Sequence, residues 1–527
     1  MKIPWELAVK RSPAWHHLVA DIKGQRERLY RMDHPQDPWR VGMGDPCRDK
    51  EAEDNAGVKR PRLLSSRSSG STFRTTCRRP GKAESREGNR MRRFQGLAGL
   101  LLGVLLELPG YAATFHAADA SEVKALMSRL RPGDELVLAV GEWKDAELHL
   151  HGQGTAEAPI RVRPAEPGEL TLSGASRIRL SGEYLEVSGM RLRNITGHRA
   201  DWIEFRYDSK QLARHCCVRD CRLSEDDSFS PRESENRWVS LYGSHNQVSH
   251  CVIEGKKNGG ATLVVWLGDA NFGTHRIVHN HFGKRPRLGK NGGETIRVGD
   301  SKTSMQSANC YIGQNLFERC DGEAECISNK SCNNVYQSNV FLEVQGTLTL
   351  RHGNACLVRD NIFLGNERPQ TGGVRIIGED HQVINNFFAD LEGNGFRSAI
   401  TLVRGLPDSP LHGYFPVKRV TIEGNTLVNC KHNLLLAYAE DPDAVIEPEQ
   451  VVIRQQRIVA RPGREVFESP GSTIQAIQWQ GNLVQADRLG IELIPGVEVV
   501  SRLEVANRPK IDKSHFGPKW LKHSRQH

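Results

Sequence analysis

One short pattern returns through the second half of this 527-residue chain at intervals that leave few folds open. An asparagine is followed two positions later by an apolar residue at Asn280, Asn315, Asn339, Asn361, Asn386 and Asn425. Four of these asparagines, from Asn315 to Asn386, are separated by 24, 22 and 25 residues, and Asp220–Leu223 and His250–Ile253 resemble degraded earlier copies. A period in the low twenties with three short β runs in each period is typical of a parallel β-helix.

The recurring asparagine suits a tight bend between two strands of such a coil. Its side chain tolerates left-handed backbone geometry and can form a hydrogen-bonded ladder from one coil to the next. A leucine-rich repeat is disfavoured because the repeats lack a helix and a regular leucine framework. A β-propeller would show a period of roughly 40 residues. The sequence therefore predicts an all-β, parallel β-helix fold.

A helix is expected at the start of this domain. Ser121 can cap a helix over 121–130, whose apolar residues fall on one face at Val123, Leu126, Met127 and Leu130. We expect this helix to cover the open N-terminal end of the solenoid, where a strand edge would otherwise be exposed. The predicted β-helix domain covers 114–485, and 486–527 are expected to form a final coil and a basic tail.

The net charge of +9 does not describe the predicted domain. Residues 1–90 contain 20 Lys and Arg against 12 Asp and Glu, a balance of +8, whereas the rest contains 52 against 51, a balance of +1. Because the excess lies outside the repeats, it gives no support to a nucleic-acid partner. Residues 1–90 lack any persistent period, which indicates a disordered or mis-assigned upstream extension.

Residues 91–113 have the layout of a secretory signal. Met91-Arg92-Arg93 is followed by the apolar run 94–106 and by small residues at 110–113. The run is too short for a stable membrane span, so we expect a periplasmic or secreted protein whose translation starts at Met91. Ten cysteines follow residue 90 without the spacing of a zinc ribbon, which indicates buried thiols or disulfides.

Polar residues at one-coil spacings mark a candidate site. In a β-helix, residues one period apart lie above one another, about 4.8 Å away. Lys330 and Arg351 are 21 residues apart, Arg351 and Arg375 are 24 apart, and Asn291 and Glu323 are 32 apart, which is one coil plus a loop. These residues are therefore expected on adjacent coils of one face.

The carboxylates of this group suggest a cation site. Glu323 and Glu325 are two positions apart, which on a strand places both on the same side. Like charges held together are unfavourable unless a cation lies between them, and with the Asn291 amide oxygen they offer ligands suited to Ca²⁺. Taken singly, each residue has a simpler interpretation: a solvated glutamate pair, a surface lysine at Lys330, or a structural ion-pair partner at Arg351 or Arg375.

These stretches also resemble the motifs of polysaccharide lyase family 6, which contains alginate lyases and chondroitinase B. The resemblance rests on Asn291–Gly299, Glu323–Ser331 and Leu350–Asn354 and extends over most of the chain after residue 132. It implies a right-handed parallel β-helix and Ca²⁺-assisted β-elimination. It further implies Asn291, Glu323 and Glu325 as calcium ligands, Lys330 as base, Arg351 as acid, and Arg375, His352 and Arg297 as substrate contacts.

The physical chemistry agrees with these implied roles. Removing the C5 proton of a uronate is difficult because the adjacent carboxylate is already negative, and Ca²⁺ on that carboxylate stabilises the developing charge. Neighbouring positive charges also favour the neutral amine of Lys330. An arginine gives up a proton reluctantly, so Arg351 either acts as the acid or stabilises charge while water delivers the proton.

The expected substrate is an acidic polysaccharide, with alginate first and chondroitin or dermatan sulfate as the alternative. Three other classes remain: a C5-epimerase, whose typical Asp-Pro-His-Asp motif is absent from the sequence; a pectate lyase, with a different arrangement of site residues; and a non-catalytic carbohydrate-binding β-helix, which would not need Lys330 and Arg351 at one-coil spacing.

Overall fold

The computed structural model describes residues 112–523, apart from 198–200, 232–234, 269–271 and 470–475. The chain divides into two units, Met1–Gly110 and Tyr111–His527. The predicted upstream extension and nearly all of the predicted signal peptide lie outside the described residues. No helix among the described residues is long and apolar enough to span a membrane.

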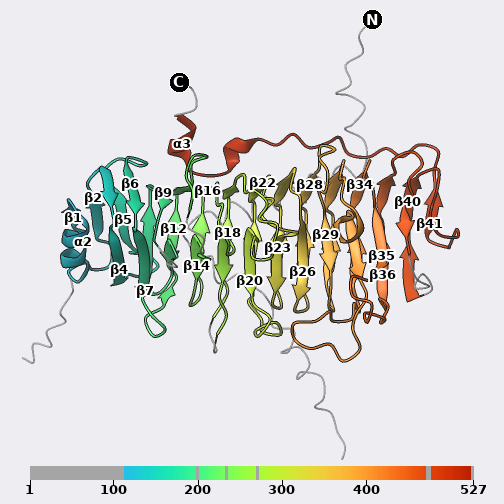
Figure 1. Ribbon diagram of the computed structural model, residues 1–527, viewed down its shortest axis with the longest axis horizontal. Helices are drawn as coiled ribbons and strands as arrows, with labels where there is room; N and C mark the ends of the chain where they lie inside the picture. Colours follow the sequence, from blue (N-terminus) through green and yellow to red (C-terminus); the bar gives the residue numbers. More distant parts are fainter. Residues whose placement is uncertain (1–111, 198–200, 232–234, 269–271, 470–475, 524–527) are drawn as a thin grey trace, which may run out of the picture. The chain divides into compact units, whose positions relative to one another are not determined.

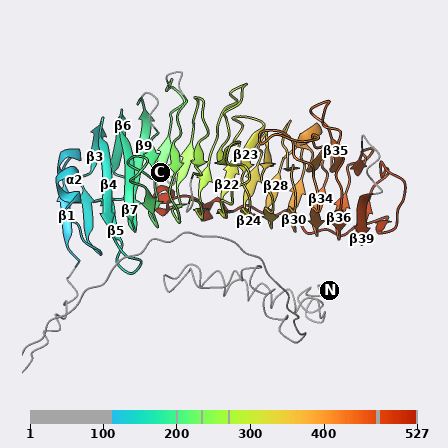
Figure 2. The same cartoon turned by 90° about the horizontal axis from the view of Figure 1, so that it is seen from below.

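The described unit is a parallel β-helix, as predicted. Short strands follow one another around each coil, and every named strand pairs in parallel with strands of adjacent coils, which builds three long sheets (Figures 1 and 2). Sheet A consists of β1 (Thr114–Ala117), β2 (Glu135–Leu138), β5 (Ile160–Pro164), β8 (Leu185–Ser188), β12 (Cys217–Arg219), β15 (Gln247–Ser249), β18 (Arg276–Val278), β21 (Tyr311–Gly313), β24 (Val335–Gln337), β27 (Leu357–Arg359), β30 (Gln382–Ile384), β33 (Thr421–Glu423), β36 (Val451–Arg454) and β39 (Ile477–Gln480).

Sheets B and C complete the coils. Sheet B consists of β3 (Gly141–Lys144), β6 (Leu170–Gly174), β9 (Met190–Ile195), β13 (Arg222–Ser224), β16 (Val252–Glu254), β19 (His281–Phe282), β22 (Leu316–Glu318), β25 (Val340–Leu342), β28 (Ile362–Leu364), β31 (Phe387–Ala389), β34 (Thr426–Val428), β37 (Arg457–Val459), β40 (Asn482–Gln485) and β41 (Val497–Val499). Sheet C consists of β4 (Glu147–Gln153), β7 (Arg177–Glu183), β10 (Ile203–Glu204), β11 (Ala213–Arg214), β14 (Val239–Leu241), β17 (Leu263–Val265), β20 (Ile296–Gly299), β23 (Glu325–Lys330), β26 (Thr347–His352), β29 (Val374–Ile376), β32 (Ile400–Val403), β35 (Leu434–Tyr438) and β38 (Phe467–Glu468).

The repeated asparagines form the predicted ladder inside the coils. Their side-chain amides donate to the next asparagine at 2.9–3.0 Å, from Asn280 through Asn425. Beside them, the aromatic rings stack in series, with centroids 4.5–5.0 Å apart, at Phe282, Phe317, Phe341, Phe363 and Phe388. Stacking identical residues on adjacent coils therefore supplies much of the core.

The predicted left-handed geometry of the asparagines is wrong. Positive φ falls on the residue before each one, for example Gln314 at 56° and Asp360 at 55°. That preceding residue makes the bend, which leaves the asparagine side chain pointing into the core. The ten cysteines in the described part are free and mostly buried, so the thiol alternative holds there.

A helix covers the N-terminal coil, but its cap differs from the expected one. The helix α2 (Ala120–Met127) packs against β1 and β4, and its buried residues are Val123 and Met127. Its N-cap is Asp119, not Ser121, because the Asp119 carboxylate accepts from the amides of Ser121 and Glu122 at 2.8 and 3.0 Å. A carboxylate two residues earlier therefore satisfies the free amides.

The C-terminal segment runs back along the coils (Figure 1). After β41 it passes the 3₁₀ turn η4 (Lys513–His515) and ends in α3 (Lys519–His523). Lys513 contacts Glu318 at 2.7 Å, and the Trp520 indole donates to the Asp220 carbonyl at 2.8 Å. A further short 3₁₀ turn, η2 (Gly395–Arg397), lies between β31 and β32. The tail thus joins coils that are far apart in the sequence.

Candidate functional site

The outer face of sheet C carries the predicted polar residues. Along β20, β23, β26 and β29, the inward side chains are fully buried apolar residues such as Ile296, Ile327, Leu348 and Val374. The positions next to them point outward and pair in register, from Arg297 to Ser328, Thr349 and Arg375. Strand alternation therefore assembles one column of polar side chains across four coils.

The pairing of Lys330 with Arg351 was predicted one residue out of register. Lys330 lies opposite His352, because β26 contains one extra residue between Leu350, which pairs with Asn329, and His352. Arg351 is that extra residue. A β-bulge of this kind turns a side chain to a new direction. The three residues are nevertheless neighbours on the outer face.

Lys330 and Arg351 have different surroundings. Among the described residues, Lys330 has no hydrogen-bond or ion-pair partner, and it is half-buried. The Arg351 guanidinium donates to the carbonyls of Gly413 at 2.7 Å and His412 at 3.2 Å and lies 4.3 Å from the Tyr414 ring centroid. Burial lowers the pKa of Arg351, although Glu325 and Tyr414 act in the opposite direction. Arg351 is thus held in place, whereas the Lys330 amine is available.

His352 is held neutral beside them. It is 1% exposed, and its Nε2 lies 3.4 Å from the Ser301 hydroxyl. Burial, together with the positive charges of Arg351 and Lys330, lowers the pKa of His352 to about 3. A neutral imidazole can donate or accept a hydrogen bond without adding charge to the site.

The loop that carries Asn291 contacts Glu323 just before the chain enters β23. The Glu323 carboxylate accepts from the amides of Gly292 and Gly293 at 2.8 and 3.1 Å, which places it against the Asn291 loop. A side chain at Gly293 would meet the Gly322 carbonyl at 2.4 Å, so only glycine allows this close approach. The asparagine and both glutamates therefore come from adjacent turns.

The donor set fits a calcium ion in its chemistry. Burial, Glu294 and Glu325 raise the pKa of Glu323 to about 7, and one buried oxygen of Glu294 has no hydrogen-bond partner. A divalent cation would relieve this repulsion. In the described part of the chain, no cluster of three or more His, Cys, Asp or Glu side chains is arranged to hold a metal unaided. The Asn291 amide oxygen and substrate or water oxygens would have to complete the shell.

Arg375 takes part in ion pairs, as the simpler interpretation of this residue from the sequence predicted. It is 4% exposed, with its guanidinium 3.7 Å from Glu325 and in contact with Glu440. Burial would lower the pKa of Arg375, but Glu325 and Glu440 raise it overall. The other oxygen of Glu325 accepts from the Ser328 hydroxyl at 2.5 Å. Arg297, the remaining candidate, lies 5.0 Å from the Trp266 ring in the preceding coil.

Three site residues were missed by sequence reasoning. His412, Tyr414 and Glu440 come from loops after β32 and β35, and the Tyr414 hydroxyl donates to Glu440 at 3.0 Å. These loops interrupt the repeat, so coil spacing cannot align them with Arg351. Their length was the only available signal.

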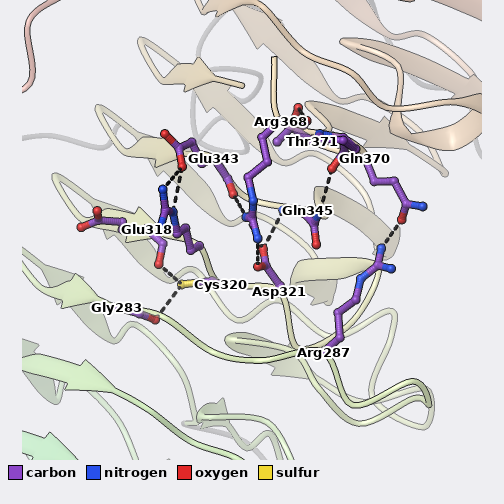
Figure 3. A network of polar contacts seen from close by, with 12 residues as sticks. Gly283, Arg287, Glu318, Cys320, Asp321, Glu343, Gln345, Arg368, Gln370 and Thr371 are labelled. Atoms are coloured by element: carbon purple, nitrogen blue, oxygen red, sulfur yellow. Dashed lines mark hydrogen bonds and ion pairs between the residues drawn. The ribbon is translucent and has the colours of Figure 1, made fainter. Parts of the chain in front are cut away.

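A buried arginine and a surface network support the loop 285–294, which carries the predicted calcium ligand Asn291. Arg285, 2% exposed, donates from its two Nη atoms to the Glu294, Gly260 and Asn258 carbonyls and to the Thr262 hydroxyl, at 2.6–3.2 Å. Figure 3 shows Arg287, in the same loop, reaching Gln370, and Arg368 paired with Asp321. The buried Arg285 and the exposed Arg287 therefore both hold this loop in place.

Comparison with known proteins gives a consistent assignment. The family model described as Chondroitinase B matches residues 117–470. The structure of the PL6 family alginate lyase AlyGC is 34% identical with a TM-score of 0.71, covering 77% of this chain and 56% of its own. A mannuronic acid specific family 6 lyase from human gut microbiota is 27% identical with a TM-score of 0.69, covering 79% and 98%.

A PL6 family polysaccharide lyase from Pseudopedobacter saltans, 23% identical with a TM-score of 0.66, shares the fold and covers 77% of this chain and 99% of its own. No curated protein matches the sequence. This chain therefore spans little more than half the length of AlyGC but nearly all of the other two lyases.

Proposed function

The chain belongs to polysaccharide lyase family 6, the family of chondroitinase B, and we propose that it cleaves a uronate-containing polysaccharide by β-elimination. One observation carries this proposal. An available lysine amine, a held arginine and a carboxylate group with raised pKa occupy the outer face of sheet C within three coils. A non-catalytic binding surface would not need this combination.

The reaction requires the C5 proton of the uronate to be removed and the C4–O bond to break. We assign proton removal to Lys330, whose amine has no competing partner among the described residues. The electron pair forms the C4=C5 double bond, and the leaving oxygen takes a proton from Arg351 or from water that Arg351 orients. His352 and Arg375 are assigned to hold the substrate.

We assign the cation site to Asn291, Glu323 and Glu325. Bound there, Ca²⁺ supplies positive charge to the uronate carboxylate, which favours loss of the neighbouring proton. The same charge would offset the repulsion that raises the pKa of Glu323. The loop that carries Asn291 fixes the Glu323 carboxylate through two backbone amides before any ligand arrives.

Alginate is the proposed substrate. Two of the similar structures, at 34% and 27% identity, are an alginate lyase and a mannuronic acid specific lyase. Chondroitin or dermatan sulfate is the second candidate, because the matching family model is described as Chondroitinase B. We also propose that the protein is exported, since residues 91–113 have the composition of a secretory signal.

The test follows the ultraviolet absorbance of the new double bond. The protein is incubated with poly-mannuronate, poly-guluronate, dermatan sulfate and polygalacturonate, with and without a chelator. We expect a signal on alginate blocks that chelation and Lys330→Ala abolish. Lys302→Ala is the matched control, because Lys302 is an exposed lysine in a neighbouring turn. No signal on any polymer would refute the lyase proposal, and a signal that survives chelation would refute the cation site.

A further inference from the structure

Two aromatic residues, Tyr242 and Trp266, form a platform on the outer face of sheet C. They lie in the coils that precede the predicted site. Tyr242 directly follows β14 and Trp266 directly follows β17. Their rings are stacked, with centroids 5.9 Å apart and planes inclined by 9°. Both side chains are half-buried, so part of each ring faces solvent. Aromatic rings that are partly open to solvent can contribute to a binding surface.

A buried serine holds this platform in place. The Trp266 indole donates to the Ser240 hydroxyl at 3.1 Å, and that hydroxyl donates to the Asp201 carboxylate at 2.6 Å. Ser240 is completely buried. The orientation of the Trp266 ring is therefore fixed in the free protein, which lowers the entropic cost of binding a ligand against it.

Arginines surround the two rings. The Arg206 guanidinium lies 3.7 Å from the Tyr242 ring centroid, and those of Arg237 and Arg297 lie 5.4 and 5.0 Å from the Trp266 ring. Arg206 also pairs with Glu204 at 3.2 Å. In the described part of the chain, Arg237 and Arg297 have no ion-pair partner, so their charge is available to an anionic ligand.

The register places the platform in line with the proposed reaction centre. Ser240, Val264, Arg297 and Ser328 pair in sequence on β14, β17, β20 and β23. At about 4.8 Å per coil, Trp266 lies two coils, or about 10 Å, and Tyr242 about 14 Å before the coil of Lys330. A polysaccharide that extends along the face from Lys330 would pass over both rings.

We propose that Tyr242, Trp266, Arg206 and Arg237 bind a uronate unit of the polysaccharide at a distance from the bond that is cleaved. The two rings cover each other and the arginines lie over them, so the sugar contacts the solvent-facing ring edges, and its carboxylate binds the guanidinium groups. This inference rests on the proposed function and adds a preference for long chains. An uncharged or short oligosaccharide gains nothing from the platform.

The experiment compares chain lengths. Initial rates of double-bond formation are measured with a uronate trisaccharide and with the polymer, for the full protein with Ca²⁺ and for Tyr242→Ala and Arg206→Gln. We expect kcat/KM on the polymer to fall about tenfold, mainly through KM, and the loss on the trisaccharide to be several-fold smaller. Tyr311→Ala is the control, because Arg276 lies 4.9 Å from that ring on sheet A, and we expect it to have no dependence on length.

The outcomes separate this inference from the proposed function. Equal losses on both substrates, or no loss on either, would overturn the platform while the wild-type signal still supports the lyase. If Tyr242→Ala does not fold, Tyr242→Phe with Arg206→Gln retains the stack and removes the charge, and it must show the same length dependence. Should the wild-type protein cleave no polymer, calorimetric titration of uronate oligomers into wild type and Arg206→Gln decides the platform alone.

Discussion

Arg285→Met tests how the loop 285–294 is held in place without changing the predicted calcium ligands. Arg285 does not touch the predicted ligands Asn291, Glu323 and Glu325 through any described hydrogen bond, yet it donates to the Glu294 carbonyl at 2.6 Å and to Gly260 at 2.9 Å. The loop from Arg285 to Glu294 is closed by these contacts. Methionine has similar length and no donor, so it removes the contacts and leaves most of the volume filled.

The expected loss of stability follows from two opposing effects. Hydrogen bonds from a charged donor contribute about 1.5–3 kcal/mol each, and the Arg285 guanidinium makes four of them. Against this, burial lowers the pKa of Arg285 to about 10, which at about 1.4 kcal/mol per unit represents a desolvation cost of roughly 3 kcal/mol. The Gly260 carbonyl loses its Arg285 partner. The net expectation is a loss of at least about 3 kcal/mol in the free energy of unfolding.

Two measurements check this expectation. Urea unfolding should show the loss of stability, and calorimetric titration should show weaker Ca²⁺ binding, by between about tenfold and about 100-fold, because the ion must then order the loop. Arg287→Met is the matched control: it lies in the same loop, is exposed, and bonds to Gln370. We expect that variant to lose less than about 0.5 kcal/mol and to keep its affinity. Equal effects from the two variants would refute the reasoning.

Three further predictions follow from other parts of the molecule. Burial and neighbouring carboxylates raise the pKa of Glu323 to about 7, so protons compete with Ca²⁺ below that pH. The apparent Kd for Ca²⁺, measured by titration, should therefore rise about tenfold from pH 8 to pH 6. A constant Kd would contradict the assignment of Glu323 as a ligand. Asn361→Ala leaves the buried Asn339 backbone amide without the side-chain oxygen that it contacts at 2.9 Å, so urea unfolding should show a loss of about 3 kcal/mol. For Gln337→Ala, a half-buried residue of the preceding coil, the loss should be less than about 0.5 kcal/mol. Trp520→Ala removes the indole bond to Asp220 and the contact with Arg191 at 5.0 Å, and it should lower stability by about 2 kcal/mol; an unchanged urea midpoint would show that the tail does not fasten the coils.

The parts of the structure that repeat could be predicted from the sequence. The spacing of the asparagines predicted the coils and their internal ladder, because a contact between adjacent coils recurs at the same interval. The stack of phenylalanines has the same interval. The same reasoning placed Lys330, Arg351 and Arg375 on one face. It works because a solenoid converts a sequence interval into a fixed distance.

Features that occur once could not be predicted in this way. The extra residue in β26 shifts the partner of Lys330 from Arg351 to His352, and no periodic signal marks it. Tyr414 and Glu440 reach the site from loops whose conformation depends on tertiary contacts. The helix is capped by Asp119 and not by Ser121, because the Asp119 carboxylate reaches two free amides. Both residues are common N-caps, so residue type alone does not decide between them.

The site is built where the chain departs from its own repeat. A regular strand on sheet C would present only alternate residues on the outer face, so it could not place Arg351 and His352 there in succession. The bulge adds one outward residue at this coil, and the two glycines before Glu294 let the loop approach close enough for Glu323 to accept from backbone amides. The regular coils on both sides fix the positions of these irregular segments. Groups that repel one another can therefore be held together within three coils, because the stability of the molecule resides in the repeats around them.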